Sequence, residues 1–183
     1  MDWSDGKKRC KWANPNNEKY VDYHDKEWGV PVYDDRKLFE TLILECFQAG
    51  LSWECVLNKR EGFRKAFDGF DPEKVAAYGE AKVEELYGNR DIVRNRLKIK
   101  AAVVNAGIFI EICREYGSFS EFLWGFTDGK VIYEKGKASS DVSGRVSREL
   151  KKRGMKFVGT VIVYAYLQAV GIIYSHEDGC FLE

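Results

Sequence analysis

The sequence predicts an all-α fold, and three observations support this prediction. Apolar residues recur at three- and four-residue spacing along most of the chain, which is the period of a helix with one buried face. Asp and Ser residues that can cap a helix precede these segments, and Gly residues follow several of them. No repeat, low-complexity tract or linker divides the chain, so we expect residues 1–183 to form a single unit.

The first half of the chain contains predicted helices that follow capping residues. We expect these helices over residues 34–47, 52–67, 72–78 and 81–87. Their caps are Asp34 or Asp35, Ser52 and the Asp71-Pro72 pair, in which Asp takes the cap and Pro the first turn. Gly50 ends the first helix, Gly79 interrupts the last two, and Gly88-Asn89 forms a turn.

The next predicted helix is the longest and covers residues 92–116. Gly117 stops it, and Ser118 or Ser120 can cap a shorter helix over residues 119–126.

The last part of the chain begins with a polar connector, residues 127–139, that can hold a short extended piece. Asp141 or Ser143 opens a helix that Gly154 closes. Residues 157–171 are rich in β-branched side chains, but the length of the segment and its terminal glycine favour a buried helix.

The composition is that of a soluble globular protein, with 45% hydrophobic and 32% charged residues. The N-terminus lacks the apolar segment of a signal peptide, and the longest apolar run, residues 161–173, is too short to span a bilayer. We therefore expect a cytoplasmic protein without a membrane partner. The five cysteines, an odd number, argue against a disulfide framework.

Basic residues are concentrated in two runs, residues 90–100 and 145–156, although the net charge is zero. Local patches of this kind can bind phosphate groups, and the first run follows the Gly88-Asn89 turn, where exposed backbone N–H groups could help. The alternative is two solvated helix faces. The candidate DNA-binding side chains in these runs are Arg90, Arg94, Arg96, Lys151, Lys152 and Arg153.

The only two histidines and two of the cysteines form a candidate metal site. Cys180 lies four positions after His176, and Cys10 and His24 lie near the other end of the chain. Two Cys and two His ligands suit a tetrahedral zinc ion, and four protein ligands leave no open position for catalysis. The alternative is two surface thiols and two unrelated histidines.

Glu45 stands within the apolar pattern of the first predicted helix. At about 100° per residue it points to the same side as Leu38 and Leu42, where an unpaired carboxylate is rare. A buried Glu paired with an Arg or backbone donor is one interpretation, and a pocket carboxylate that binds a ligand is the other.

Four aromatic residues could form a cage that stacks a flat base, although such residues more often belong to a core. They are Trp12, Tyr23, Trp28 and Trp53. A Glu beside such a cage could accept a hydrogen bond from the exocyclic amine of a purine.

Ordered motifs over nearly the whole chain resemble the bacterial 3-methyladenine DNA glycosylase I family. They are RCKW, YHDKEWGVP, KLFE, QAGLSW, VLNKRE, FDP, KKRG, KFVGT and HEDGC. The resemblance implies a helix–hairpin–helix glycosylase that excises N3-methyladenine and carries a zinc ion joining its termini.

The family belongs to the helix–hairpin–helix glycosylases, so the resemblance implies two helical lobes, with the N- and C-terminal segments packed together around the zinc ion.

The resemblance also implies roles for individual residues. The zinc ligands would be Cys10, His24, His176 and Cys180. Glu45 would be the pocket glutamate that reads the base. Tyr23 and Trp53 would stack on it, with Trp28 and Trp12 shaping the slot. The Gly50-Leu51 loop would enter the gap left by the flipped base.

The chain departs from the family pattern at three positions, Cys46, Phe47 and Met155. Because Phe47 adjoins the pocket glutamate, the sequence leaves open how it affects the selectivity of the pocket.

The function implied is that of a monomeric hydrolase that acts on alkylated double-stranded DNA and leaves an abasic site. No Lys is clearly placed for a Schiff base, so a lyase step is not expected. The main alternative is a non-enzymatic DNA-binding module with a structural zinc ion. A zinc hydrolase and a plain helical scaffold are two others.

Overall fold

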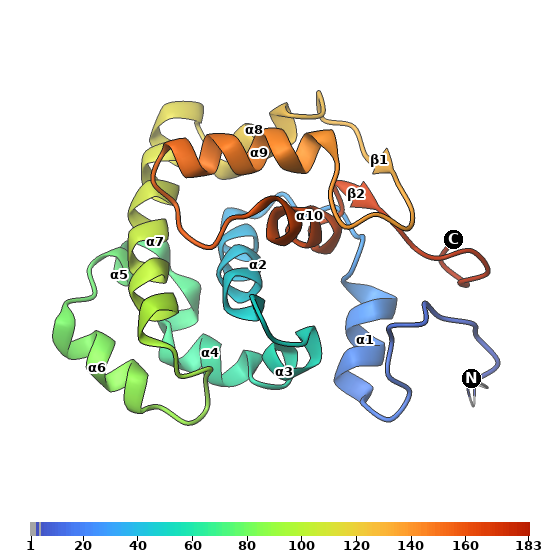
Figure 1. Ribbon diagram of the computed structural model, residues 1–183, viewed down its shortest axis with the longest axis horizontal. Coiled ribbons are helices and arrows are strands. Elements are labelled where there is room, and N and C mark those ends of the chain that lie inside the picture. The colour runs from blue at the N-terminus through green and yellow to red at the C-terminus, as the bar shows by residue number, and fades with distance from the viewer. Residues whose placement is uncertain (1–2, 4) are drawn as a thin grey trace.

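The computed structural model describes residue 3 and residues 5–183, and this part of the chain is mostly helical (Figure 1). Its elements in chain order are α1 (Glu18–Lys26), α2 (Asp35–Gln48), α3 (Trp53–Asn58), α4 (Arg60–Ala66), the 3-10 helix η1 (Asp68–Phe70), α5 (Pro72–Ala76), α6 (Glu80–Gly88), α7 (Arg96–Tyr116), α8 (Phe119–Gly125), β1 (Ile132–Tyr133), α9 (Asp141–Lys152), α10 (Thr160–Ala169) and β2 (Ile173–Tyr174). Residues 1, 2 and 4, which the predicted unit 1–183 includes, lie outside the described residues.

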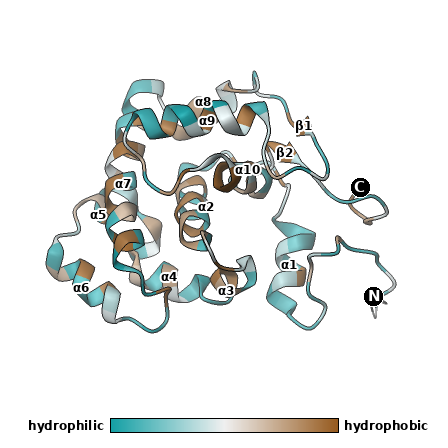
Figure 2. Cartoon of the chain, viewed as in Figure 1, coloured by the Kyte–Doolittle hydropathy of each residue, from teal (hydrophilic) through white to brown (hydrophobic). Residues whose placement is uncertain are grey.

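Helix α2 forms the centre of the core. Nine of its 14 residues are buried, and it contacts α7 on one side and α10 on the other. Figure 2 shows hydrophobic residues concentrated on α2 and α10, whereas α1 and α9 carry many hydrophilic ones. The central position of α2 explains why an ionisable residue on its inner face is held away from solvent.

Several predicted helix starts are confirmed. The side chains of Asp34, Ser52 and Ser118 each accept a hydrogen bond from a backbone N–H three residues later. Asp71 caps α5 in the same way, with Pro72 in the first turn. These caps satisfy N–H groups that have no partner within the helix.

Other predicted boundaries are wrong. The helix predicted from Ser52 to Phe67 is two helices, α3 and α4, that meet at Lys59. The long helix starts at Arg96 rather than at residue 92, because the Asn95 side chain caps it. Helix α9 is capped by Ser140, and Ser143 is its partner in a capping box.

The two ends of the chain lie side by side (Figure 1). The N–H of Phe181 donates to the Lys8 carbonyl at 2.8 Å, and the N–H of Lys11 donates to the Glu177 carboxylate at 2.7 Å. Strands β1 and β2 pair in parallel just before the last segment. The short N-terminal and C-terminal segments therefore pack against each other and against α1.

No helix of the described residues is both long enough and apolar enough to cross a membrane.

Candidate functional site

A cavity of about 170 Å³ lies where α1, α2, α3 and α10 meet. Its lining residues are Trp12, Tyr20, Tyr23, Trp28, Glu45, Gln48, Trp53, Ala165 and Gln168. The structure thus brings together the Glu and the four aromatic residues that the sequence singled out. The cavity is smaller than a typical site for a drug-sized ligand, at roughly 300–1,000 Å³, and suits one small planar molecule.

Glu45 reaches this cavity from the inner face of α2. Its side chain is 2% exposed, and its Oε2 atom finds no hydrogen-bond partner among the described residues. Burial raises the pKa of Glu45 to about 8, because the charged form loses its solvation. The interpretation of a Glu paired with an Arg therefore does not hold, and the free oxygen is available to a ligand.

The walls of the cavity are aromatic. The rings of Tyr23 and Trp53 lie 5.2 Å apart, and those of Trp12 and Trp28 lie 4.9 Å apart, edge to face. The Trp53 Nε1 atom is also buried without a hydrogen-bond partner in the described part of the chain. A flat molecule with hydrogen-bonding edges matches both the walls and the two unsatisfied polar atoms.

The sequence interpretation missed four lining residues. Tyr20 lies one helical turn before Tyr23, and Gln48 lies one turn after Glu45, so a three-residue spacing could have indicated both. Ala165 and Gln168 belong to α10 and reach the cavity only through tertiary packing.

Phe47 does not line the cavity. It is fully buried, and its ring packs against those of Phe63 at 4.8 Å and Phe67 at 5.9 Å. It therefore belongs to the core on the other side of α2 from Glu45 and is not among the residues that line the cavity.

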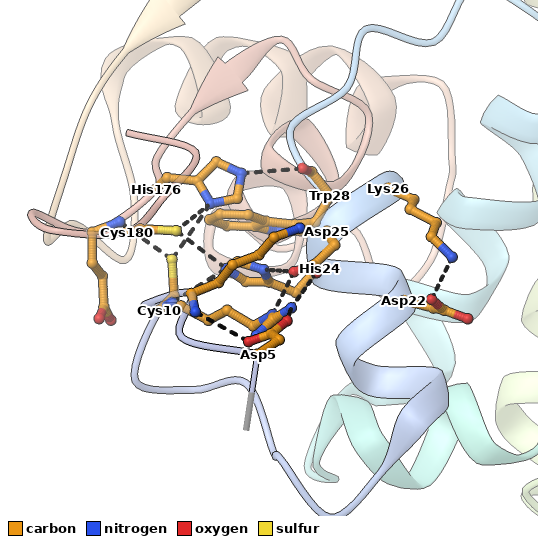
Figure 3. Close-up of polar contacts among 12 residues, drawn as sticks. Asp5, Cys10, Asp22, His24, Asp25, Lys26, Trp28, His176 and Cys180 are labelled. Atoms are coloured by element: carbon orange, nitrogen blue, oxygen red, sulfur yellow. Dashed lines mark hydrogen bonds and ion pairs between the residues drawn. The ribbon is translucent and has the colours of Figure 1, made fainter. Parts of the chain in front are cut away.

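The four Cys and His residues converge at the junction of the chain ends (Figure 3). Their ligand atoms all lie within 4.8 Å of one another, and all four residues are buried. The Cys180 Sγ atom is 3.5 Å from both His24 Nε2 and His176 Nδ1, and Cys10 Sγ is 3.5 Å from His176 Nδ1. Zinc bonds of roughly 2.0–2.3 Å in a tetrahedron require ligand separations of about 3.3–3.8 Å. The donor set and its spacing therefore fit a tetrahedral metal ion.

A second layer of contacts orients this cluster. The Asp25 carboxylate lies 2.8 Å from His24 Nδ1, and Arg9 donates two hydrogen bonds to Asp25, at 2.8 and 2.6 Å. Burial lowers the pKa of His24 and brings that of His176 to about 4. Both imidazoles are therefore neutral at pH 7, the form that can bind a metal.

Gly29 permits the close approach of the two chain ends. Its φ is +81°, which favours glycine, and a Cβ atom there would lie 3.3 Å from His176 Nε2. It directly follows Trp28, whose carbonyl oxygen is 3.4 Å from the same nitrogen.

The cavity and the Cys/His cluster lie on opposite sides of the Trp12 and Trp28 rings. The Trp12 ring lies 5.1 Å from the His24 ring, and the Trp28 ring lies 4.7 Å from the His176 ring. The same two indoles line the cavity on their other side. The cluster therefore fixes one wall of the cavity without reaching into it.

The Gly50-Leu51 loop follows the end of α2, near the cavity. Gly50 has a φ of +79°, and Leu51 is 42% exposed. The Lys98 ammonium donates to the carbonyl oxygens of Phe47 and Ala49, at 2.8 and 2.5 Å. Lys98 belongs to the first basic run, and its buried position is a correction: it caps the end of α2 and is not free to bind phosphate.

The other basic residues differ in whether their side chains form ion pairs. Arg90, Arg94, Lys151 and Lys152 are exposed and form no ion pair among the described residues. Arg96 pairs with Glu84, and Arg153 pairs with Glu115 and Glu149. The last two cations must share or exchange these partners before they can contact a phosphate.

Comparison with known proteins agrees with this geometry. The methyladenine glycosylase family model matches residues 12–183. DNA-3-methyladenine glycosylase 1 of Escherichia coli is 43% identical, with 94% of this chain and 95% of the relative covered. DNA-3-methyladenine glycosylase of Haemophilus influenzae is 39% identical, with 94% and 96% covered.

Solved structures give the same result. A crystal structure of 3-methyladenine DNA glycosylase I has a TM-score of 0.91 at 44% identity, covering 95% of this chain and 98% of that one. A Staphylococcus aureus structure of 3-methyladenine recognition has a TM-score of 0.90 at 36% identity, covering 94% and 95%. The helical fold and the aromatic pocket define an enzyme of the glycosylase class. The chain belongs to the methyladenine glycosylase family.

Proposed function

We propose that this enzyme excises N3-methyladenine from alkylated double-stranded DNA by hydrolysis and leaves an abasic site. The observation that carries the proposal is the free Oε2 atom of Glu45 inside an aromatic pocket of nucleobase size. The names of the relatives, which include 3-methyladenine, support the choice of base.

The proposed chemistry depends on the charge of the damaged base. N3-methylation makes adenine cationic within the nucleotide, so the base leaves as a neutral molecule when the glycosidic bond breaks, and water adds to the sugar carbon. The damaged base pairs poorly and is flipped at low cost. Tyr23 and Trp53 would stack on the cation, while Glu45 would accept a hydrogen bond from the exocyclic amine. A cation beside Glu45 lowers its pKa and favours the carboxylate.

The residues that line the cavity support base removal without cleavage of the DNA strand. A lyase step needs an amine that forms a Schiff base with the sugar. The lining of the cavity contains no lysine among the described residues, so we propose a monofunctional enzyme.

We propose that the Cys/His cluster holds one structural zinc ion. Cys10 and Cys180 would bind through sulfur, His24 through Nε2 and His176 through Nδ1. Four protein ligands leave no position for water, so the ion would stabilise the junction of the chain ends and supply no chemistry to the reaction.

The proposed DNA-binding surface includes the Gly50-Leu51 loop and the hairpin between α6 and α7, which would be the helix–hairpin–helix element. Leu51 would enter the space left by the flipped nucleotide. The cations proposed to contact phosphates are Arg90, Arg94, Arg96, Lys151, Lys152 and Arg153. We propose that the chain acts as one monomeric unit of two helical lobes, on DNA in the cytoplasm.

The test is base release from methylated duplex DNA, resolved by chromatography, for the wild type and Glu45→Gln in parallel. We expect release of 3-methyladenine by the wild type and a decrease of about a hundredfold in the variant, the typical cost of losing one electrostatic contact to a reacting group. Glu61→Gln, a change on the exposed face of α4, serves as the control. If folded wild-type protein released no base, the proposal would be wrong.

A further inference from the structure

Phe157 has an unusual backbone conformation and an exposed aromatic ring. It lies between α9 and α10, its φ is +56°, and its side chain is 36% exposed. A bulky residue with positive φ is a genuine outlier. Such strain persists only where the surrounding structure imposes it, and it is often found at functional sites.

Buried side chains on both sides impose this conformation. The Lys156 N–H donates to Asn105 Oδ1 at 2.8 Å, and Asn105 Nδ2 donates to the Lys156 carbonyl at 3.0 Å. On the other side, the Ser147 hydroxyl donates to the Val158 carbonyl at 2.7 Å. Asn105 and Ser147 are almost fully buried. The residues before and after Phe157 are therefore fixed, and its ring is presented at the surface by a rigid loop.

This ring is close to the Gly50-Leu51 loop. The Lys98 ammonium lies 6.0 Å from the centre of the Phe157 ring and 2.5 Å from the Ala49 carbonyl oxygen. The buried lysine thus links the exposed Phe157 ring to the segment that leads into exposed Leu51, although more than a hundred positions separate Phe157 and Leu51 in the sequence.

Charge on the same loop fits a nucleic-acid partner. Lys156, beside Phe157, is exposed, as are Lys151 and Lys152 at the end of α9. An exposed aromatic ring bordered by lysines can contact bases through its face while the ammonium groups reach the phosphates.

We propose that Phe157 is a second DNA-contacting wedge, which packs against the base pair beside the flipped nucleotide while Leu51 fills the gap. The inference rests on the proposed function, because it requires duplex DNA with a flipped base as the partner. It assigns the strained loop a role in holding the distorted duplex rather than in binding the free base.

The experiment compares wild type, Phe157→Ala and Phe157→Leu. Tyr133→Ala, which removes an exposed ring on β1, is the matched control. One assay measures affinity for a duplex that contains a tetrahydrofuran abasic analogue, over a series of salt concentrations. A second measures the affinity of the same proteins for free 3-methyladenine, and a third measures base release from methylated DNA.

We expect Phe157→Ala to bind the duplex about tenfold more weakly, since loss of one base–aromatic contact has an effect of this size. Phe157→Leu should keep most of the affinity, because it keeps an apolar wedge. The slope of log affinity against log salt should not change, since no phosphate contact is lost. Affinity for free 3-methyladenine should match the wild type.

Two results would overturn the inference. Unchanged duplex affinity in Phe157→Ala would show that the ring does not contact DNA. A parallel loss of duplex and free-base binding would show that the ring only supports the fold of the pocket. Failure of the proposed function gives a different result, because the wild type itself would then release no 3-methyladenine.

Discussion

The aromatic cavity around Glu45 and the Cys/His cluster both contact the indoles of Trp12 and Trp28 but differ in how their polar atoms are satisfied. In the cluster, Asp25 orients His24, and each sulfur lies near an imidazole nitrogen. In the pocket, Glu45 Oε2 and Trp53 Nε1 are buried without partners in the described part of the chain. Buried polar atoms are normally paired, so the paired atoms of the cluster favour a structural role, and the unpaired atoms of the cavity favour a role in binding a ligand.

The largest effect should follow from loss of a metal ligand. Cys180→Ser should abolish stoichiometric zinc binding and lower the unfolding midpoint by about 10 °C or more, because metal binding to a structural site contributes directly to folding. Zinc content by mass spectrometry and thermal unfolding by circular dichroism are the measurements.

Cys55→Ser is the control for this change, because Cys55 lies outside the cluster and is half-buried on α3. If Cys180→Ser kept the wild-type unfolding midpoint but lost activity, the structural role assigned to the cluster would be wrong. The cluster would then take part in the reaction.

A change at Glu45 should raise stability while it lowers activity, whereas a change at Cys180 should lower stability. Burial raises the pKa of Glu45 from 4.5 to about 8, so the folded protein holds this proton where the unfolded chain has lost it. The stability contributed by the protonated form is complete below pH 4.5 and is lost as pH rises through 8.

Glu45→Gln removes this dependence of stability on pH, because glutamine has no proton to lose in this range. We therefore expect the variant to unfold at a higher temperature than wild type at pH 8.5, by several degrees, and the gain to shrink toward pH 5, while activity is lost. Thermal unfolding from pH 5 to 9 is the measurement. A variant less stable than wild type at every pH would mean that Glu45 has a structural partner.

The sequence predicts those parts of the fold that depend on local chemistry. Asp34, Ser52 and Asp71 cap helices because their side chains accept from N–H groups within the next three residues. The inward position of Glu45 follows from helical periodicity. Strand β1 falls within the connector 127–139, where a short extended piece was predicted, but two-residue strands are too short for the sequence to indicate that β1 pairs with β2.

Features that depend on contacts between distant segments could not be predicted. The burial of Lys98 results from its position opposite the end of α2, and a run of basic residues contains no sign of it. The positive φ of Phe157 has no glycine to indicate it, since Asn105 and Ser147 impose it from other helices. The family resemblance places residues in a site, but these supporting contacts become visible only in three dimensions.

The smallest expected effect is that of a change at Asp25, which contacts the proposed metal ligand His24. Asp25→Asn keeps the size of the side chain but removes the charge that faces His24 and Arg9. Partners of metal-bound histidines typically contribute a factor of about 10–100 in metal affinity, so we expect zinc affinity to fall by about tenfold. Competition with a chromophoric chelator measures this affinity.

Asp22→Asn is the matched control, because Asp22 lies on the same helix and its one ion pair among the described residues is with the exposed Lys26 (Figure 3). It should leave zinc affinity unchanged. With zinc in excess, Asp25→Asn should also keep the wild-type affinity for free 3-methyladenine, since Asp25 does not line the cavity and the indoles of Trp12 and Trp28 lie between the cluster and the cavity. Equal zinc affinity in the two variants would mean that the four ligands alone define the site and that the carboxylate behind His24 contributes nothing to it.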